Sequence, residues 1–315
     1  MSFSVRTDLA IEASAMLSRK AGESIDGVEV DEYKKGCTSV TRVTVTNKNG
    51  ENVIGKPAGK YITIECEDIR GGSDEALMHA EDAFADELGK LTAQLGKGAV
   101  LVVGLGNRFI TPDALGPNTV DSVEVTRHLF EQMPERVNPT SRSVCALAPG
   151  VLGITGIETL EIIRGVVDRV QPGLIIAIDA LASRSIRRIS TTIQLADTGI
   201  TPGSGIGNRR MGINEQSLGV PVIAVGVPTV VDAATIANDA IELIMQAVND
   251  AVGEDSDTMR SLGFLNDDNR YEMIRTVLYP SVGDLIVTPK EVDTIIQDIS
   301  GVVARGINRA VGNGY

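Results

Sequence analysis

Two apolar runs, each associated with an aspartate that precedes Ala-Leu, constrain the fold of this chain more than any other feature. The first run, at residues 99–104, leads to Asp113, and the second, at residues 174–179, ends on Asp179. Runs this rich in aliphatic and β-branched side chains are typical of strands buried on both faces of a parallel sheet. Ligands and catalytic groups gather at the carboxyl ends of such strands. The pattern therefore predicts two carboxylates at one edge of an α/β sheet.

The remaining hydrophobic pattern predicts a three-layer α/β/α fold with a mostly parallel central sheet. Alternating apolar and polar residues near the N-terminus indicate an antiparallel β addition, with turns at Lys35-Gly36 and Lys48-Asn49-Gly50. We expect strands at residues 28–35, 38–46, 60–66, 99–104, 143–148, 174–179, 189–195 and 220–227. We expect helices at residues 73–95, 118–131, 155–170, 232–252 and 288–312, the last with Pro289 in its first turn, and a mobile surface loop at residues 253–268.

Length, charge and cysteine content exclude several classes of protein. The 315 residues suffice for one large α/β domain, and a net charge of −13 argues against direct binding to nucleic acid. No run reaches the roughly 18 apolar residues that suggest a membrane span. The N-terminus lacks the pattern of a secretory leader. The three cysteines, Cys37, Cys66 and Cys145, are scattered and lack CxxC spacing. This cysteine pattern and the missing leader pattern together indicate a reducing cytoplasm.

Other catalytic arrangements lack parts in this sequence. The turn at residues 104–107 has no third glycine to complete a dinucleotide fingerprint. The two histidines, His79 and His128, form no HExxH motif, so a histidine-rich zinc site cannot be built. Cysteine catalysis would need a paired histidine. Glycine-rich stretches at residues 149–159 and 199–208 could hold a peptide carbonyl through backbone amides, or could simply be tight connections.

Each acid also has a simpler structural explanation. Asp113 could cap the helix expected at residues 118–131, and Asp179 could bind a backbone amide at a strand end. Asp232 is more typical of a helix cap than of a third catalytic acid. Together, Asp113 and Asp179 would still face one crevice, where one acid stays protonated and the other ionised. Such a pair can polarise a carbonyl and activate water, and a divalent metal held by the same carboxylates is an alternative.

Long phrases in a fixed order carry a resemblance to a known family. They are SVRTDLAIEA, VVGLGN with TPDALGP, TRHLFE, APGVLGITGIET, IIAIDALASRS, GITPGSGIGNRR, GVPVIAVGVPTVVDA and VTPKEVD. The chain resembles the spore germination proteases, the GPR endopeptidase family. The resemblance implies a homotetrameric endopeptidase of the forespore or spore core, which begins the degradation of small acid-soluble spore proteins during germination. It also implies that Asp113 and Asp179 are the two acids of the family.

A more remote similarity links the chain to hydrogenase maturation proteases, whose two metal-binding acids occupy the same strand ends. A fold related to those proteases is therefore implied. The mechanism stays open between a paired-aspartate site without a cofactor and a metal-dependent peptidase that uses Asp113 and Asp179. A non-catalytic module that holds a metal or ligand is a further alternative.

The resemblance also implies a zymogen that removes its own N-terminal segment. The stretch Thr7-Asp8-Leu9-Ala10-Ile11-Glu12 carries acids around small and apolar residues, like the sites that these proteases cut in spore proteins. We expect cleavage after Asp8, which would leave Leu9 at the mature N-terminus. The chain would then consist of a propeptide at residues 1–8 and a single peptidase domain at 9–315, whereas a solvated tail is the simpler alternative.

Overall fold

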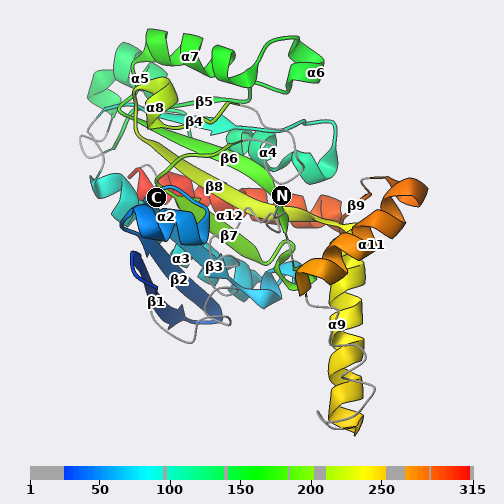
Figure 1. Cartoon of the computed structure of the whole chain (residues 1–315). Coiled ribbons are helices and arrows are strands. Elements are labelled where there is room, and N and C mark those ends of the chain that lie inside the picture. The colour runs from blue at the N-terminus through cyan, green and yellow to red at the C-terminus, as the bar shows by residue number, and fades with distance from the viewer. Residues whose placement is uncertain are drawn as a thin grey trace.

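A computed structural model describes residues 25–94, 98–137, 141–183, 185–201, 211–252, 267–283 and 285–312. Across these residues a nine-stranded sheet has the order β1-β2-β3-β7-β8-β6-β4-β5, with β9 paired to β8 (Figure 1). Strands β5, β4, β6 and β8 run parallel to one another, and all other pairings are antiparallel. The parallel block is therefore continuous with the antiparallel strands in a single mixed sheet.

The strands are β1 (Val28–Lys35), β2 (Thr38–Val45), β3 (Gly59–Glu65), β4 (Val100–Gly104), β5 (Val144–Leu147), β6 (Leu174–Ser183), β7 (Thr192–Ala196), β8 (Val222–Asp232) and β9 (Ile286–Val287). The α-helices are α2 (Lys48–Ile54), α3 (Asp74–Gln94), α4 (Leu115–Ser122), α5 (Arg127–Gln132), α6 (Leu152–Thr155), α7 (Thr159–Val170), α8 (Glu215–Leu218), α9 (Ala233–Val252), α11 (Asp267–Val282) and α12 (Val292–Ala310). Short 3₁₀ turns are η1 (Glu67–Gly71), η2 (Thr111–Asp113), η3 (Pro134–Arg136) and η4 (Ile186–Arg188).

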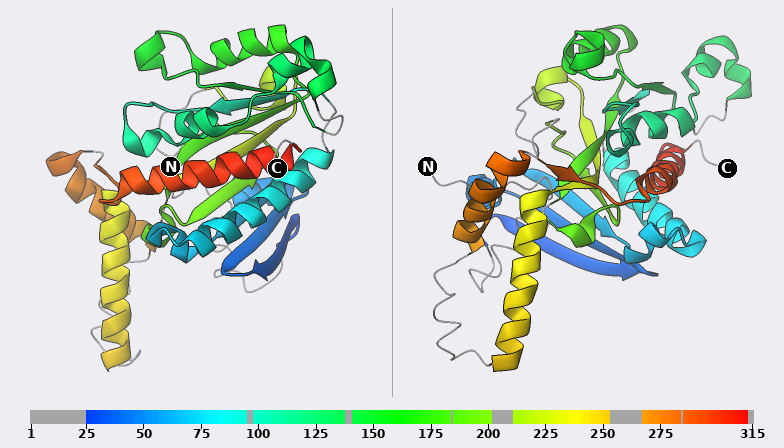
Figure 2. Two further views of the ribbon diagram at one scale, coloured as in Figure 1. Left: turned by 180° about the vertical axis from the view of Figure 1, so that it is seen from behind. Right: turned by 90° about the vertical axis from the view of Figure 1, so that its right-hand side faces the viewer.

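Helices cover both faces of the parallel block, and each strand contributes alternate residues to the two sides. In β4, Val100 and Val102 pack in the core beneath α3, α4 and α12, whereas Leu101 and Val103 pack beneath α7 and α8. Figure 2 shows α3 and α12 side by side on the first of these faces. This arrangement confirms the three-layer α/β/α prediction, and the β1-β2-β3 meander confirms the antiparallel addition. Helix α9 extends away from the sheet, with α11 against it (Figures 1 and 2).

The prediction of one helix at residues 118–131 is wrong. The chain instead forms two helices, α4 and α5, because tertiary hydrogen bonds interrupt the helix between them. After α4, the amide of Glu124 donates to Oδ1 of Asn308 in α12 (3.0 Å). The amide of Thr126 donates to the carbonyl of Val144 in β5 (2.9 Å), and the amide of Val144 donates to Oγ1 of Thr126 (3.0 Å). These partners replace the helical bonds that residues 123–126 would otherwise make.

Other expected boundaries also differ. The turn expected at residues 48–50 is the start of α2, which Asn47 caps by accepting a hydrogen bond from the amide of Gly50 (2.9 Å). The helix expected at 155–170 begins only at Thr159, as α7, because Gly156 with a left-handed φ of 70° ends the short preceding helix α6. The last helix begins at Val292 rather than near Pro289. The strand expected at 220–227 continues to Asp232 as β8. Helix α11 and strand β9 were not expected.

A buried carboxylate ties the antiparallel end of the sheet to α3. The side chain of Glu87 in α3 is only 1% exposed. It accepts hydrogen bonds from Tyr33 of β1 (2.8 Å), from Arg42 of β2 through Nε and Nη2 (2.8 Å each) and from Lys90 (2.6 Å). Burial opposes ionisation of Glu87, but these hydrogen bonds outweigh it and lower its pKa to about 2. The network therefore stabilises the folded state through an ionised acid.

We expect Glu87→Gln to lower the free energy of unfolding at pH 7 by on the order of 3 kcal/mol, since the pKa falls from 4.5 to about 2 on folding. A lowered pKa stabilises the fold above the unfolded value near 4.5, and this contribution is lost as the pH falls through about 2. Urea unfolding of both proteins between pH 7 and pH 2.5 should therefore show a difference that narrows with acid. Asp86→Asn, which removes a half-exposed partner of Lys35, serves as the control and should cost about 1 kcal/mol or less. A pH-independent difference for Glu87→Gln would contradict the prediction.

Candidate active site

Asp179 lies where β6 first extends beyond its neighbour β4. Gly104, the last residue of β4, pairs with Ile178, and the amide of Leu105 still donates to the Ile178 carbonyl (2.8 Å). Beyond this point β6 pairs with β8 alone, and Asp179 stands opposite Gly226. The expected strand at residues 174–179 is therefore too short, because the ribbon formed with β8 carries β6 on to Ser183.

The Asp179 side chain is almost fully buried, with 6% of its surface exposed. Strand alternation places it on the same face as Ile175 and Ala177, which pack beneath α7 and α8. Its Oδ1 accepts a hydrogen bond from the amide of Ala180 (3.0 Å). The contact with a backbone amide that the simpler explanation predicted is thus present, and it fixes a buried carboxylate at the edge of β4.

Glycines allow the chain leaving β4 to fold back tightly on itself. Gly106 has φ of +110°, and a Cβ atom at this position would lie 2.0 Å from the carbonyl oxygen of Asp113. A Cβ on Gly116, in the first turn of α4, would lie 2.3 Å from the carbonyl oxygen of Leu105. Both positions therefore require a residue without a side chain. The GxG motif at residues 104–106 therefore allows the two backbone segments to lie close together.

This folded-back loop brings Asp113 to the carboxyl edge of the sheet. Asp113 closes η2, and its Oδ2 accepts a hydrogen bond from the amide of Asn107 (2.7 Å). It does not cap α4, whose N-cap is Ala114 and has no side-chain cap. The turn η2 packs against β6, β8 and α12. The structure therefore brings the element that carries Asp113 against the strand that carries Asp179.

Exposed apolar side chains flank this edge, and the hydrophobic pattern of the sequence did not predict them. Phe109 and Ile110, in the loop before η2, are 82% and 52% exposed. The loop after β5 emerges at the same edge because β5 and β4 are parallel neighbours, and there Leu152, Ile154 and Ile157 are also exposed. In the sequence these residues stand in the phrases NRFITPD and APGVLGITGIET, directly after apolar runs. Their position there was the available indication that they lie at the edge of the sheet.

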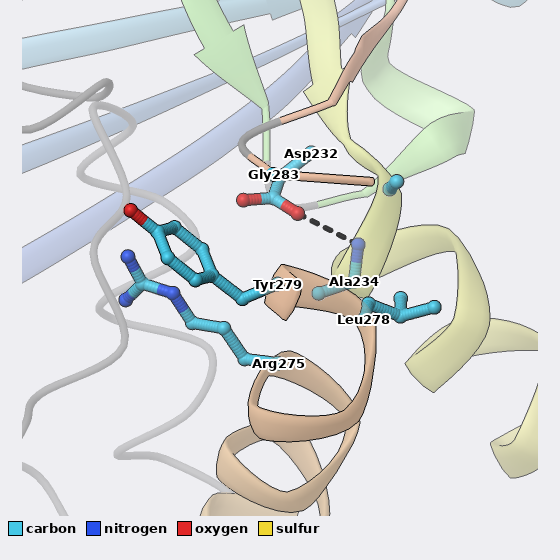
Figure 3. A pocket seen from close by; sticks show the side chains of 7 residues that line it. Asp232, Ala234, Arg275, Leu278, Tyr279 and Gly283 are labelled. Atoms are coloured by element: carbon cyan, nitrogen blue, oxygen red, sulfur yellow. Dashed lines mark hydrogen bonds between the residues drawn. The ribbon is translucent and has the colours of Figure 1, made fainter. Parts of the chain in front are cut away.

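Asp232, the third acid considered in the sequence, is the last residue of β8. Asp232 accepts a hydrogen bond from the amide of Ala234 (2.6 Å) at the start of α9, as expected for a helix cap. It lines a shallow pocket with Arg275 and Tyr279 of α11 (Figure 3). Among the described residues, no group of three or more His, Cys, Asp or Glu side chains could hold a metal ion. Asp8, Leu9 and residues 202–210 lie outside the described part of the chain.

Comparison with known proteins supports the resemblance drawn from the motifs. The family model described as germination protease matches residues 6–263 and 249–314. The chain belongs to the germination protease family. A germination protease of Clostridium tetani is 48% identical over 308 residues, which cover 98% of this chain and 95% of the relative. A relative of the same name from Bacillus cereus strain G9842 is 42% identical over 345 aligned positions, covering 98% and 94%. Family membership supports a protease that acts on protein substrates.

A solved structure, the NiFe hydrogenase maturation protease HycI from Thermococcus kodakarensis, also matches part of this chain. The match has 20% sequence identity and a TM-score of 0.29, and covers 42% of this chain and 76% of HycI. None of the helices in the described part of the chain is both long enough and apolar enough to cross a membrane.

We expect Gly106→Ala to disrupt the loop that carries Asp113, because the added Cβ would meet the Asp113 carbonyl and alanine disfavours φ of +110°. Proteolytic activity should fall at least tenfold, with a lower melting temperature. Gly165→Ala in α7 is the matched control, because nothing lies within 4 Å of a Cβ at that position. Wild-type activity and melting temperature for Gly106→Ala would contradict this account of the loop.

Proposed function

We propose that this chain is an endopeptidase that starts the degradation of small acid-soluble spore proteins during germination, with Asp113 and Asp179 as its catalytic acids. The observation that carries the proposal is the packing of η2 against β6 at the edge where β4 ends. Asp179 thus lies on β6 and Asp113 in the turn η2 that follows its parallel neighbour β4, at the carboxyl edge where α/β folds place their chemistry. The family membership supports the proteolytic reaction.

In the proposed mechanism, the two carboxylates divide acid and base roles between them. The ionised acid takes a proton from a water molecule, and the water oxygen attacks the carbonyl carbon of the scissile peptide. The protonated acid donates to the carbonyl oxygen as negative charge develops there. When the C–N bond breaks, the proton taken from water passes to the leaving amine. Backbone amides of Asn107 and Ala180 would hold the two carboxylates in position.

Apolar residues at the same edge fit an extended peptide substrate. Phe109 and Ile110 beside η2, and Leu152 and Ile154 in α6, would contact apolar side chains of the substrate. The net charge of −13 favours substrate proteins that have left the DNA over direct binding to nucleic acid. The enzyme would work in the spore core as a homotetramer.

We expect Asp113→Asn and Asp179→Asn each to lower the rate of substrate cleavage by at least about a hundredfold, because neither amide can exchange the proton. Circular dichroism and gel filtration would check that the variants fold and assemble as the wild type does. Asp168→Asn, at an exposed position of α7, is the control and should cleave at the normal rate. If either active-site variant folds and cleaves at the wild-type rate, the paired-acid mechanism is wrong.

Chelation separates the two mechanisms that use these acids. Under the paired-acid mechanism, a chelator leaves the cleavage rate unchanged. Loss of activity on chelation that one divalent ion restores would instead favour a metal-dependent peptidase.

We also propose that the chain is made as a zymogen and cut by itself between Asp8 and Leu9. N-terminal sequencing and intact mass of the matured protein should therefore give Leu9 as the first residue. The Asp113→Asn protein should keep residues 1–8, because the same site performs the cut. A mature N-terminus at another residue, or processing of the Asp113→Asn protein when it is alone in solution, would contradict this proposal.

A further inference from the structure

Three reactive side chains meet at the antiparallel end of the sheet, in elements separate from those that carry the candidate active site. The Sγ atom of Cys37 lies 3.3 Å from Sγ of Cys66 and 3.4 Å from Nδ1 of His79. Cys37 lies in the turn between β1 and β2, Cys66 follows β3, and His79 lies in α3. The sequence separates Cys37 from Cys66 by 29 positions and from His79 by 42, so no local motif indicates the cluster.

The fold holds this cluster in a defined arrangement. Gly36 has φ of +61°, and a Cβ atom there would lie 2.7 Å from Nδ1 of His79. The imidazole therefore lies directly against a turn that needs glycine both for its backbone and for its space. On the other side, the amide of Cys66 donates to the Thr191 carbonyl (2.9 Å), which fixes the backbone of the buried cysteine.

The two thiols differ in the way that a reactive and a resolving cysteine differ. Cys37 is exposed to solvent, whereas only 1% of Cys66 is exposed and its side chain belongs to the main core. Burial, together with the contact with Cys37, raises the pKa of the Cys66 thiol to about 11. Cys37 is therefore the thiol that an oxidant in solution can reach. Cys66 stays protonated and buried, in the position of a resolving thiol.

We propose that Cys37 and Cys66 form a redox-responsive thiol pair that a peroxide converts into an intramolecular disulfide, with His79 as the base for Cys37. His79 Nδ1 accepts the Cys37 proton, and the thiolate attacks one peroxide oxygen. The O–O bond breaks, leaving sulfenic acid on Cys37 and a hydroxide that takes the proton from His79. Sγ of Cys66 then attacks the Cys37 sulfur, the S–O bond breaks, and hydroxide leaves as water with the Cys66 proton. In total, two thiols and hydrogen peroxide give one disulfide and two waters.

The disulfide would add a covalent tie to a region held by ion pairs, strand pairing and apolar packing. The β1–β2 hairpin is attached to α3 by Lys35 to Asp86 and by the Glu87 network. A bond from Cys37 to Cys66 would close the chain between the hairpin turn and the end of β3, which restricts the unfolded state. Because cytoplasmic disulfides are mostly transient and redox-sensing, we expect the bond to form under oxidation and to be reversible.

The test uses the full chain treated with hydrogen peroxide and then with an alkylating agent. We expect peptide mapping to show one Cys37–Cys66 disulfide, no intermolecular link, and its loss on reduction with dithiothreitol. The melting temperature of the oxidised wild-type protein should exceed that of the reduced protein by several degrees. Cys145→Ser, the matched control in β5, should behave as the wild type does. Cys66→Ala should instead accumulate sulfenic or sulfinic acid on Cys37.

Peroxide treatment that leaves both thiols free, or that gives the same overoxidation of Cys37 in wild-type protein and in Cys66→Ala, would overturn the proposal. The Cys37→Ser variant changes only the exposed thiol, so it tests the pair even if Cys66→Ala does not fold. It should form no disulfide and should show no peroxide-dependent change in melting temperature. A rise equal to that of the wild type would also overturn the proposal.

The role of His79 has its own measurement. We expect His79→Gln to slow the reaction of Cys37 with iodoacetamide about tenfold at neutral pH, with a melting temperature close to that of the wild type. Added imidazole should restore part of the rate, which a purely structural role would not produce. His128→Gln, at the exposed histidine of α5, should react as the wild type does. An unchanged rate for His79→Gln would remove His79 from the proposal.

Discussion

The pairing of Gly104 with Ile178 at the end of β4 is the constraint on which the candidate active site depends. Once the Leu105 amide has made its last sheet hydrogen bond, the chain must reverse at once to keep η2 against β6. Only glycine fits at position 106, where φ is +110° and a side chain would meet the Asp113 carbonyl. The apolar runs place β4 and β6 side by side. Gly106 then allows the chain to turn back, so that η2, which carries Asp113, packs against β6, which carries Asp179.

The antiparallel end of the sheet is stabilised by a different kind of interaction. Glu87 is as buried as the apolar residues of α3, but it is ionised and paired with Arg42 and Lys90. Removing one member of such a group leaves charge without compensation, which costs far more than losing a surface pair. The Cys37 and Cys66 pair lies on the same hairpin and β3. Oxidation would thus add a covalent bond to a region that is already held by ion pairs, strand pairing and apolar packing.

The sequence predicted most of the strands, because these follow from local periodicity. The shared site of Asp113 and Asp179 stays a prediction, which follows from the geometry of parallel sheets. The sequence did not predict the break after α4, which depends on a hydrogen bond from Glu124 to Asn308, 184 residues further along the chain. The sequence also did not predict that β6 extends to Ser183. Beyond the end of β4, this extension depends on pairing with β8, which lies far along the chain. The contact of Cys37 with His79 has no spacing that a motif could capture.

Hydrogen bonds to backbone amides do not by themselves distinguish a catalytic from a structural carboxylate, because Asp113 and Asp179 both accept one. The surroundings of Asp113 are more informative. A helix cap would explain an acid at this position, but α4 is capped by no side chain. An 82% exposed Phe109 two residues beyond the amide donor Asn107 gains little from folding, since burial is what stabilises an aromatic ring. A loop that holds an acid by a main-chain amide and leaves its large apolar residues in solvent is better explained by contact with a substrate than by stabilisation of the fold.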